Sequence, residues 1–355
     1  MSIRKNKGEW SEFYVLTFLL SQGKLYAADS HLNRIENMFF PVDKIIRDEE
    51  QNKHVEYVIH KDDIDVVDDY QNINTIKKSQ LVIISRYLYE RIKEGGKSAF
   101  SIDHSEEFMK ELNCTKVTAP STDKTDITLQ IHDINTGYNP VCGFSIKSEL
   151  GHPPTLLNAG KTTNFIYKVS GISANQMEMI NSISTRTKIN DRIKAIQDHG
   201  SISFERAANN TFASNLMMID TRMEEIIGWL LLEYYGTNIK KCDELIHNIE
   251  ESNPLHFPRS GLYEYKFRKF LCSVALGMVP SKEWDGKEEA NGGYIIVTSD
   301  GDVVAYHMYN RDEFETYLLT NTKLEKASTS RHNFASLYIQ GDEMYINLNL
   351  QIRFI

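Results

Sequence analysis

Residues 125–149, TDITLQIHDINTGYNPVCGFSIKSE, form the stretch that decides the fold. In its first part Ile127, Leu129 and Ile131 alternate with polar residues, which is typical of a strand with one buried face. A segment rich in Asn, Gly and Pro (135–140) then predicts a turn. Because a second alternating segment follows the turn, we expect a β-hairpin with one apolar face and one polar face.

The polar face of this hairpin carries an acid and a lysine. Phe144 and Ile146 point to one side of the second strand, and Lys147 lies on the other side. If both apolar rows face the core, Asp126 and Lys147 share the opposite face. An acid there can hold a divalent metal that neutralises charge on a phosphate, while a lysine orients or deprotonates a water, as phosphodiester hydrolysis requires. The alternative is a solvated sheet face with an ordinary Asp and Lys.

The bulk composition is that of a globular protein. The 355 residues, 41% hydrophobic and 25% charged, suffice for two or three domains or for one large domain with additions. No apolar run approaches a membrane span and no signal-peptide core is present, so we expect a cytoplasmic protein without a membrane partner. The four cysteines lack metal-ligand spacing, which predicts neither a zinc site nor a disulfide framework.

The charge is uneven along the chain. The net charge of −9 argues weakly against a nucleic-acid partner. Residues 143–210, however, hold eight basic residues against five acidic ones. This excess is compatible with DNA binding over a limited footprint, and equally with solvated helix faces.

Residues 8–22 predict a helix that ends at Gly23. Glu9 and Glu12 lie three residues apart near its start and therefore share a face. One interpretation is that they complement the positive end of the helix dipole. The other is that one of them reaches the metal site.

Two loop-like segments carry residues suited to DNA contacts. The irregular segment 151–164 contains Asn, Lys and Thr side chains that can bind phosphates and base edges. A second cluster, residues 330–333, includes Arg331, and arginine can read guanine through two hydrogen bonds. In both segments the same residue types also make ordinary turns and loops.

Several sequence blocks resemble the HpaII family of type II restriction endonucleases. They run from KGEWSEFYVL and GKLYAAD, through STDKTDITLQIHDINTGYNPVCGFSIKSELG and TLLNAGKTTNFIYK, to EYKFRKFL, GGYIIV, DGDVVAYHMYNRDEFETYL, ASTSRHNF and LNLQIRFI. The resemblance implies an α/β (mixed α+β) protein with a PD-(D/E)xK core, in which helices flank a mixed sheet that holds a Mg²⁺ site at one edge. We expect a nuclease core at 1–170, a mainly helical region at 171–290, and a β-rich region at 291–355 packed on the core.

The resemblance also assigns roles to the hairpin. Asp126 takes the place of the motif's first acid and Lys147 that of its lysine. The position of the second acid is Ser145, which cannot supply a carboxylate. Sequence alone therefore leaves the second acidic metal ligand open.

Three glutamates are candidates for that second ligand. Glu12 is the first, because the first helix of such folds packs beside the catalytic strands. Glu9 and Glu149 are the alternatives, and Glu149 shares the strand face of Lys147 if the strand continues. The expected Mg²⁺ ligands are thus Asp126, the carbonyl of Ile146 and one of these glutamates.

The implied activity is Mg²⁺-dependent cleavage of double-stranded DNA at CCGG, within a restriction-modification system. A cognate DNA methyltransferase is then a functional partner without stable contact. A palindromic target favours a homodimer, and a monomer that nicks each strand in turn is the alternative. The residues expected to contact DNA are Asn158, Lys161, Thr162, Asn164, Arg186, Lys188, Arg331 and His332.

Two further hypotheses compete with this one. A repair or structure-specific nuclease on the same core would cut branched or damaged DNA without a fixed sequence. A non-catalytic DNA-binding protein would explain Ser145 as the sign of a decayed site. The presence of both Asp126 and Lys147 counts against decay.

Overall fold

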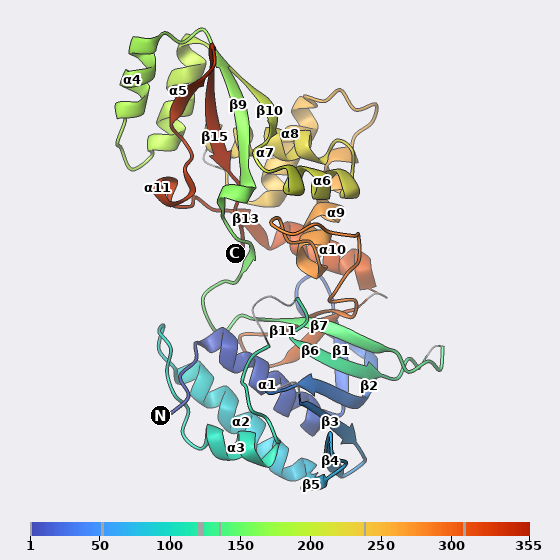
Figure 1. Ribbon diagram of the computed structural model, residues 1–355. Coiled ribbons are helices and arrows are strands. Elements are labelled where there is room, and N and C mark those ends of the chain that lie inside the picture. The colour runs from blue at the N-terminus through green and yellow to red at the C-terminus, as the bar shows by residue number, and fades with distance from the viewer. Residues whose placement is uncertain (1, 51–52, 120–123, 135, 238, 308–309) are drawn as a thin grey trace. The chain divides into compact units, whose positions relative to one another are not determined.

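The computed structural model describes residues 2–50, 53–119, 124–134, 136–237, 239–307 and 310–355 (Figure 1). Asn135 of the expected turn lies outside the described residues. The chain divides into two compact units, one formed by Met1–Pro154 with Glu288–Phe314 and the other by Thr155–Lys287 with Glu315–Ile355. Each unit therefore contains segments that are distant in the sequence.

The first unit contains a mixed sheet of nine strands. Their order is β1-β12-β11-β7-β6-β2-β3-β4-β5. β1 pairs with β12 and β11 with β7 in parallel, whereas the other neighbours are antiparallel. The strands span Lys24–Ala28 (β1), Arg34–Asp48 (β2), His54–Ile59 (β3), Asp63–Asp68 (β4), Ile73–Lys77 (β5), Ile127–Ile131 (β6), Val141–Ser148 (β7), Gly293–Val297 (β11) and Val303–Tyr306 (β12).

The hairpin expected from residues 125–149 is confirmed. β6 and β7 pair antiparallel, with Ile127 opposite Phe144 and Leu129 opposite Cys142. All four side chains belong to the buried core of this unit. Since the apolar rows of both strands face the core, the residues between them lie on the other face of the hairpin.

β11 joins this sheet beside β7 and is buried along its whole length. Its sequence GYIIV is continuously apolar, which suits a strand covered on both faces. It begins at Gly293, whose φ of 107° favours glycine, and a Cβ there would lie 1.9 Å from the carbonyl oxygen of Tyr306. Glycine is therefore required where β11 meets β12.

Helices α1 (Lys7–Gln22), α2 (Lys78–Glu94) and α3 (Ser105–Glu111) complete the first unit. Figure 1 shows α1 beside α2, and α1 also contacts β7. α1 begins with a capping box in which the side chains of Asn6 and Glu9 bind each other's backbone N–H groups. It ends at Gly23, whose φ of 65° is left-handed.

The second unit contains two antiparallel sheets. One has the order β10-β9-β15-β14 and the other β13-β16-β8. The strands span Thr155–Leu157 (β8), Asn164–Ser170 (β9), Ser201–Ala207 (β10), Thr322–Leu324 (β13), Leu337–Gln340 (β14), Glu343–Asn349 (β15) and Ile352–Phe354 (β16).

Helices surround these sheets, and α5 and α7 contact β10. The helices span Ala174–Ser182 (α4), Lys188–His199 (α5), Asn210–Ile219 (α6), Met223–Gly236 (α7), Cys242–Ser252 (α8), Leu262–Leu276 (α9) and Thr329–His332 (α11), and a short 3-10 turn covers Lys161–Thr163. A further helix, α10 (Arg311–Thr320), begins in the first unit, which extends to Phe314, and continues in the second. None of the helices in the described part of the chain is long and apolar enough to cross a bilayer.

The units do not follow the consecutive ranges expected from the sequence. Residues 155–170 belong to the second unit, and residues 291–314 supply β11 and β12 to the first. The region 171–290 contains helices α4 to α9 and also β10. These differences arise from strand pairing between distant segments, which local periodicity does not encode.

A buried ion pair anchors the segment that leads toward the hairpin. Arg47 and Glu49 at the end of β2 are 7% and 4% exposed, and Arg47 Nε lies 2.9 Å from Glu49 Oε1. The Arg47 guanidinium donates to the carbonyl of Lys116 at 2.8 Å. Glu49 Oε2 accepts from the backbone N–H and hydroxyl of Thr115 at 2.6 and 2.7 Å. The pair therefore fixes residues 115 and 116 against β2.

Replacing Glu49 by Ala leaves the Arg47 charge buried without its partner. We expect a loss of about 3–5 kcal/mol in the free energy of unfolding, measured by urea denaturation. Glu56→Ala is the control, because Glu56 pairs with Lys44 at 2.7 Å on the surface and should cost less than about 1 kcal/mol. Equal losses in the two variants would contradict the anchoring role.

Candidate active site

Asp126 sits immediately before β6, where its carboxylate reaches across to β7. Its backbone N–H donates to the carbonyl of Phe144 at 2.8 Å. Its Oδ2 accepts from the backbone N–H of Ile146 at 2.6 Å and from the hydroxyl of Ser145 at 3.0 Å. The acid is therefore held by a strand backbone and a neighbouring side chain rather than free in solvent.

Ser145 connects this acid to the lysine. The hydroxyl of Ser145, a residue only 3% exposed, accepts from Lys147 Nζ at 2.8 Å. The same ammonium donates to the carbonyl of Ile146 at 3.2 Å. It also lies 5.1 Å from the ring centroid of Tyr294 on β11. The structure thus brings together the four positions expected from the hairpin pattern, namely Asp126, Ser145, Ile146 and Lys147.

Burial lowers the pKa of Lys147, and the negative charges of Asp126 and Glu12 oppose this shift. A lysine with a lowered pKa has a larger neutral fraction near neutral pH. Lys147 can therefore accept a proton as well as orient a water molecule. This is the environment that a lysine needs for proton transfer.

α1 supplies the glutamate that was the first candidate. The hydroxyl of Ser11 on this helix donates to that of Ser148 at the end of β7, at 2.8 Å. The next residue, Glu12, accepts from the backbone N–H of Ala119 through Oε2 at 3.0 Å. α1 is therefore fixed to the strand that carries Lys147.

The pKa of Glu12 is raised to about 8. Burial is the largest cause, and repulsion by Asp126 is the second. The hydrogen bond from Ala119 and the positive charges of Arg47 and Lys147 act in the opposite direction. The carboxylates of Glu12 and Asp126 are thus close enough to repel each other, and Glu12 is largely shielded from water. A bound cation would reduce this repulsion.

The two alternative glutamates have other partners. Glu9 forms the capping box of α1, accepting from the backbone N–H of Asn6 at 2.8 Å, and pairs with Lys5 at 2.9 Å. Glu149 accepts from the backbone N–H of Ser299 at 3.0 Å, in the turn after β11. β7 ends one residue before Glu149, so this side chain does not continue the strand face of Lys147.

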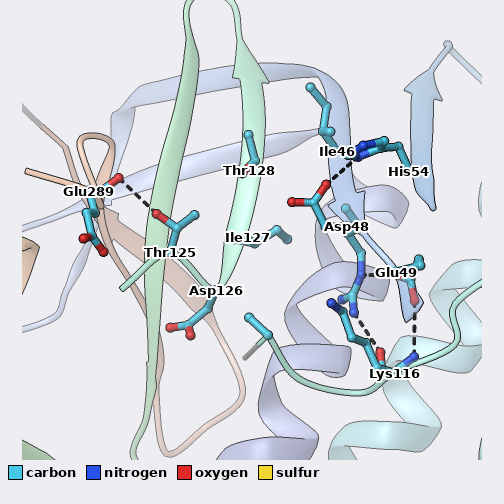
Figure 2. Close-up of a pocket in the computed structure, with 12 residues that line it drawn as sticks. Ile46, Asp48, Glu49, His54, Lys116, Thr125, Asp126, Ile127, Thr128 and Glu289 are labelled. Carbon is cyan, nitrogen blue, oxygen red and sulfur yellow. Dashed lines mark hydrogen bonds and ion pairs between the residues drawn. The ribbon is translucent and has the colours of Figure 1, made fainter. Parts of the chain in front are cut away.

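A pocket of about 640 Å³ opens beside Asp126 (Figure 2). Asp126 and Ile127 form one wall and the anchored segment with Lys116 and Ala119 another. On a third side, Figure 2 shows the side chains of Asp48 and His54 paired, with 2.5 Å between Asp48 Oδ1 and His54 Nδ1. The carboxylate of Asp126 is therefore reachable from open space.

Lys124 also belongs to this site, although it is not among the residues predicted from the sequence. Burial lowers its pKa to about 8, the charge of Lys147 adds to the shift, and Glu289 and Asp126 oppose it. Its backbone N–H faces Glu289 Oε2 at 3.4 Å. A signal was available, since Lys124 precedes Asp126 by two residues, the spacing that keeps side chains on one strand face. The roles of Glu289 and Tyr294 had no local signal, because both come from a segment distant from the hairpin in sequence. Ala119 lies close to the hairpin, but its partner Glu12 is distant from it in sequence.

The residues expected to contact DNA all lie in the second unit. Those exposed are Asn158, Lys161, Arg186 and Arg331, and those partly exposed are Thr162, Lys188 and His332. Asn164, by contrast, is 4% exposed. Its amide donates to the carbonyl of His332 at 2.9 Å and accepts from Asn349 at 2.7 Å. The structure gives Asn164 the role of holding α11 to β9.

The oxygen atoms that the hairpin and α1 supply suit a hard cation. Asp126, Glu12 and the carbonyl of Ile146 offer carboxylate and carbonyl oxygens, the ligands that Mg²⁺ prefers. Within the described ranges, no cluster of three or more His, Cys, Asp and Glu side chains could hold a metal. The site thus combines two carboxylates and a backbone carbonyl with a lysine whose pKa is lowered.

Comparison with known proteins agrees with the sequence blocks. The family model of the HpaII restriction endonuclease matches residues 6–354. The type II restriction enzyme HpaII of Haemophilus parainfluenzae is 40% identical over 356 residues, which cover 99% of this chain and 98% of that protein. No solved structure gives a significant match. The resemblance is thereby confirmed, and the chain belongs to the HpaII restriction endonuclease family.

Proposed function

We propose that this type II restriction endonuclease cuts duplex DNA at CCGG in a Mg²⁺-dependent reaction, and that its first unit is a PD-(D/E)xK core. The observation that carries the proposal is the chain of contacts from Asp126 through Ser145 to Lys147. An acid on one strand and a lysine on its neighbour, beside a helix glutamate, match the layout of that core. The pocket next to Asp126 gives a phosphate access.

Asp126, Glu12 and the Ile146 carbonyl are the residues that would hold Mg²⁺. The raised pKa of Glu12 supports this assignment, because burial and the neighbouring Asp126 make a second negative charge costly without a cation. When bound, Mg²⁺ supplies positive charge that neutralises the phosphate and stabilises the developing negative charge. Glu149 and Glu9 are disfavoured by their own hydrogen bonds.

Lys147 orients the attacking water and takes its proton. In a single in-line displacement, the water oxygen bonds to phosphorus while the bond to the 3′ oxygen breaks. The 3′ oxygen leaves with the electron pair of that bond and takes a proton from solvent water. Lys147 is suited to this step because burial lowers its pKa. The Ser145 hydroxyl and Ile146 carbonyl hold its Nζ in place, so the amine does not have to be ordered during the reaction.

Ser145 replaces the second acid of the motif without breaking the site. Its hydroxyl donates to Asp126 and accepts from Lys147, so it fixes the distance between the two groups. We propose that the carboxylate lost at this position is supplied from α1 by Glu12. A decayed site would not be expected to keep both partners of Ser145 in hydrogen-bond contact.

Recognition of CCGG is proposed from the family relationship. Guanine in the major groove is read best by Arg or Lys, and Lys161, Arg186, Lys188 and Arg331 are the candidates. A two-fold homodimer would match the palindrome. A cognate methyltransferase, acting in the same cytoplasm without stable contact, would protect the host's own sites.

A plasmid digest tests the activity directly. With Mg²⁺ the purified protein should give discrete fragments whose ends map to CCGG, and EDTA should abolish cleavage. CpG-methylated plasmid, run beside it, reports whether the enzyme is blocked by modification. Fragments without a common sequence would favour a repair or structure-specific nuclease instead.

Lys147→Ala should lower the cleavage rate roughly 10²- to 10⁴-fold, the range typical of losing a group that transfers a proton. DNA binding, measured by fluorescence anisotropy, should be kept. Lys93→Ala, on the outer part of α2, serves as the control and should cleave normally. If Lys147→Ala cleaved like the control, the proposed catalytic role of the lysine would be lost.

Glu12 and Glu9 lie on the same helix, so substitutions of Glu9 serve as controls for substitutions of Glu12. The pKa of Glu12 is about 8 in the folded protein, against an ordinary value of 4.5. Between these pH values the folded protein binds a proton that the unfolded chain has lost, so the free energy of unfolding falls as pH rises. In EDTA, Glu12→Gln should therefore raise the melting temperature at about pH 9 and leave it nearly unchanged at about pH 5. Calorimetry at both pH values measures this.

Glu9→Gln should show a different pattern, because glutamine keeps the capping-box contact but loses the charge that pairs with Lys5 and complements the helix N-terminus. We expect a slightly lower melting temperature at both pH values and normal cleavage. Glu12→Gln, in contrast, should lose cleavage despite its higher stability. A Glu12→Gln protein that is active, or less stable at high pH, would contradict the assignment of Glu12 to the metal.

A further inference from the structure

A second pocket lies within the second unit, between α5, the segment around α11, and the β14–β15 pair. Its volume is about 510 Å³. Lys188 and Arg192 of α5 line it together with neutral polar side chains, among them Thr329, Asn333 and Ser336. Its described lining contains two cationic side chains and no carboxylate. The chain as a whole carries a net charge of −9, so this lining is opposite in sign to the protein's overall charge.

Arg192 is the central feature of this pocket. It is only 7% exposed. One end of its guanidinium donates to the Ala335 carbonyl at 2.5 Å and to the Ser336 hydroxyl at 3.0 Å. The other end donates to the carbonyls of Asn181 and Ile183 at 2.5 and 2.9 Å. Its Nε is buried without a hydrogen-bond partner.

The charge of Arg192 is thus not balanced within the described chain. All of its hydrogen bonds go to neutral carbonyl and hydroxyl oxygens, and none of the described carboxylates pairs with it. Burying a cation without a counter-ion is costly. An anion in the pocket would offset that cost.

Lys188 adds a second positive charge at the pocket. It precedes Arg192 by four residues on α5, so both side chains lie on the same face of the helix. Lys188 is partly exposed, and hence reaches both the pocket and solvent. Donors on Asn333, Thr329 and Ser336 could complete a shell around a phosphate group.

We propose that this pocket binds a backbone phosphate of the DNA substrate, a role that rests on the proposed endonuclease function. Lys188, one of the four candidates for reading guanine, contacts the phosphate instead, which leaves base reading to the other three. Arg192 keeps the floor of the pocket positive while it holds the segment 335–336. The volume exceeds that of one phosphate group, which leaves room for the adjoining sugar. Contacts of this kind position a duplex without reading its sequence.

The dependence of DNA affinity on salt tests this role. Binding of two short duplexes, one with CCGG and one without, is measured by fluorescence anisotropy at several salt concentrations, with Ca²⁺ in place of Mg²⁺ to keep the DNA intact. Lys188→Ala should weaken binding of both duplexes by a similar factor. It should also reduce the slope of log affinity against log salt by about 0.9, the value for one lost phosphate contact.

Lys194→Ala is the matched control on the same helix. Lys194 is exposed and does not line the pocket, so its loss should leave the slope nearly unchanged. Ser330→Asp, which adds a negative charge to the lining, should weaken both duplexes further. Arg192 is not varied, because its bonds to three carbonyls make folding depend on it.

Each remaining outcome overturns the proposal. The pocket does not touch DNA if the salt slope is the same for the wild type, Lys188→Ala and Lys194→Ala. This conclusion would hold even if inorganic phosphate at high concentration raised the melting temperature of the protein. A loss confined to the CCGG duplex would make the pocket a base-reading site. If either result is found while the wild type cleaves plasmid normally, the phosphate-binding role of the pocket is wrong and the endonuclease function stands. A wild type that neither binds nor cleaves DNA would end the function proposal as well.

Discussion

The Asp126 carboxylate accepts hydrogen bonds from the Ile146 N–H and the Ser145 hydroxyl, and the rest of the candidate site depends on this contact. It joins the start of β6 to the middle of β7. Since Ser145 also accepts from Lys147, one hydroxyl sets the separation of acid and base. The register of the hairpin therefore fixes the chemistry, because a slip of one residue would turn Ser145 and Lys147 toward the core.

A second layer of structure brings in the remaining carboxylate. Ser11 binds α1 to Ser148, and the buried Arg47–Glu49 pair anchors Thr115 and Lys116, which lie shortly before Ala119. The N–H of Ala119 then holds Glu12. Helix α1, the anchored residues and the hairpin thus meet around Glu12, whose pKa is raised first by burial and second by the charge of Asp126. A bound cation would favour the charged form of Glu12 and so oppose this shift.

Local patterns predicted the hairpin and the placement of Asp126 and Lys147 on its polar face, because the alternation of apolar residues and the turn signal lie within 25 residues. The family resemblance predicted the function, and the comparisons confirmed it. The interleaved units could not be predicted, since the parallel pairing of β11 with β7 joins segments about 150 residues apart. For the same reason Asn164 looked like a surface contact, whereas Asn349 and His332 enclose it. Lys124 was within reach of the strand pattern and was overlooked.

The central claim is that Asp126, Glu12 and the Ile146 carbonyl hold the divalent cation. Fe²⁺ bound in place of Mg²⁺, with ascorbate and peroxide, cuts the polypeptide next to the metal, and mass spectrometry locates the cuts. The account predicts cuts near all three residues in the wild type and their loss in Asp126→Asn. Cuts confined to Thr155–Lys287, or an unchanged pattern in Asp126→Asn, would contradict it.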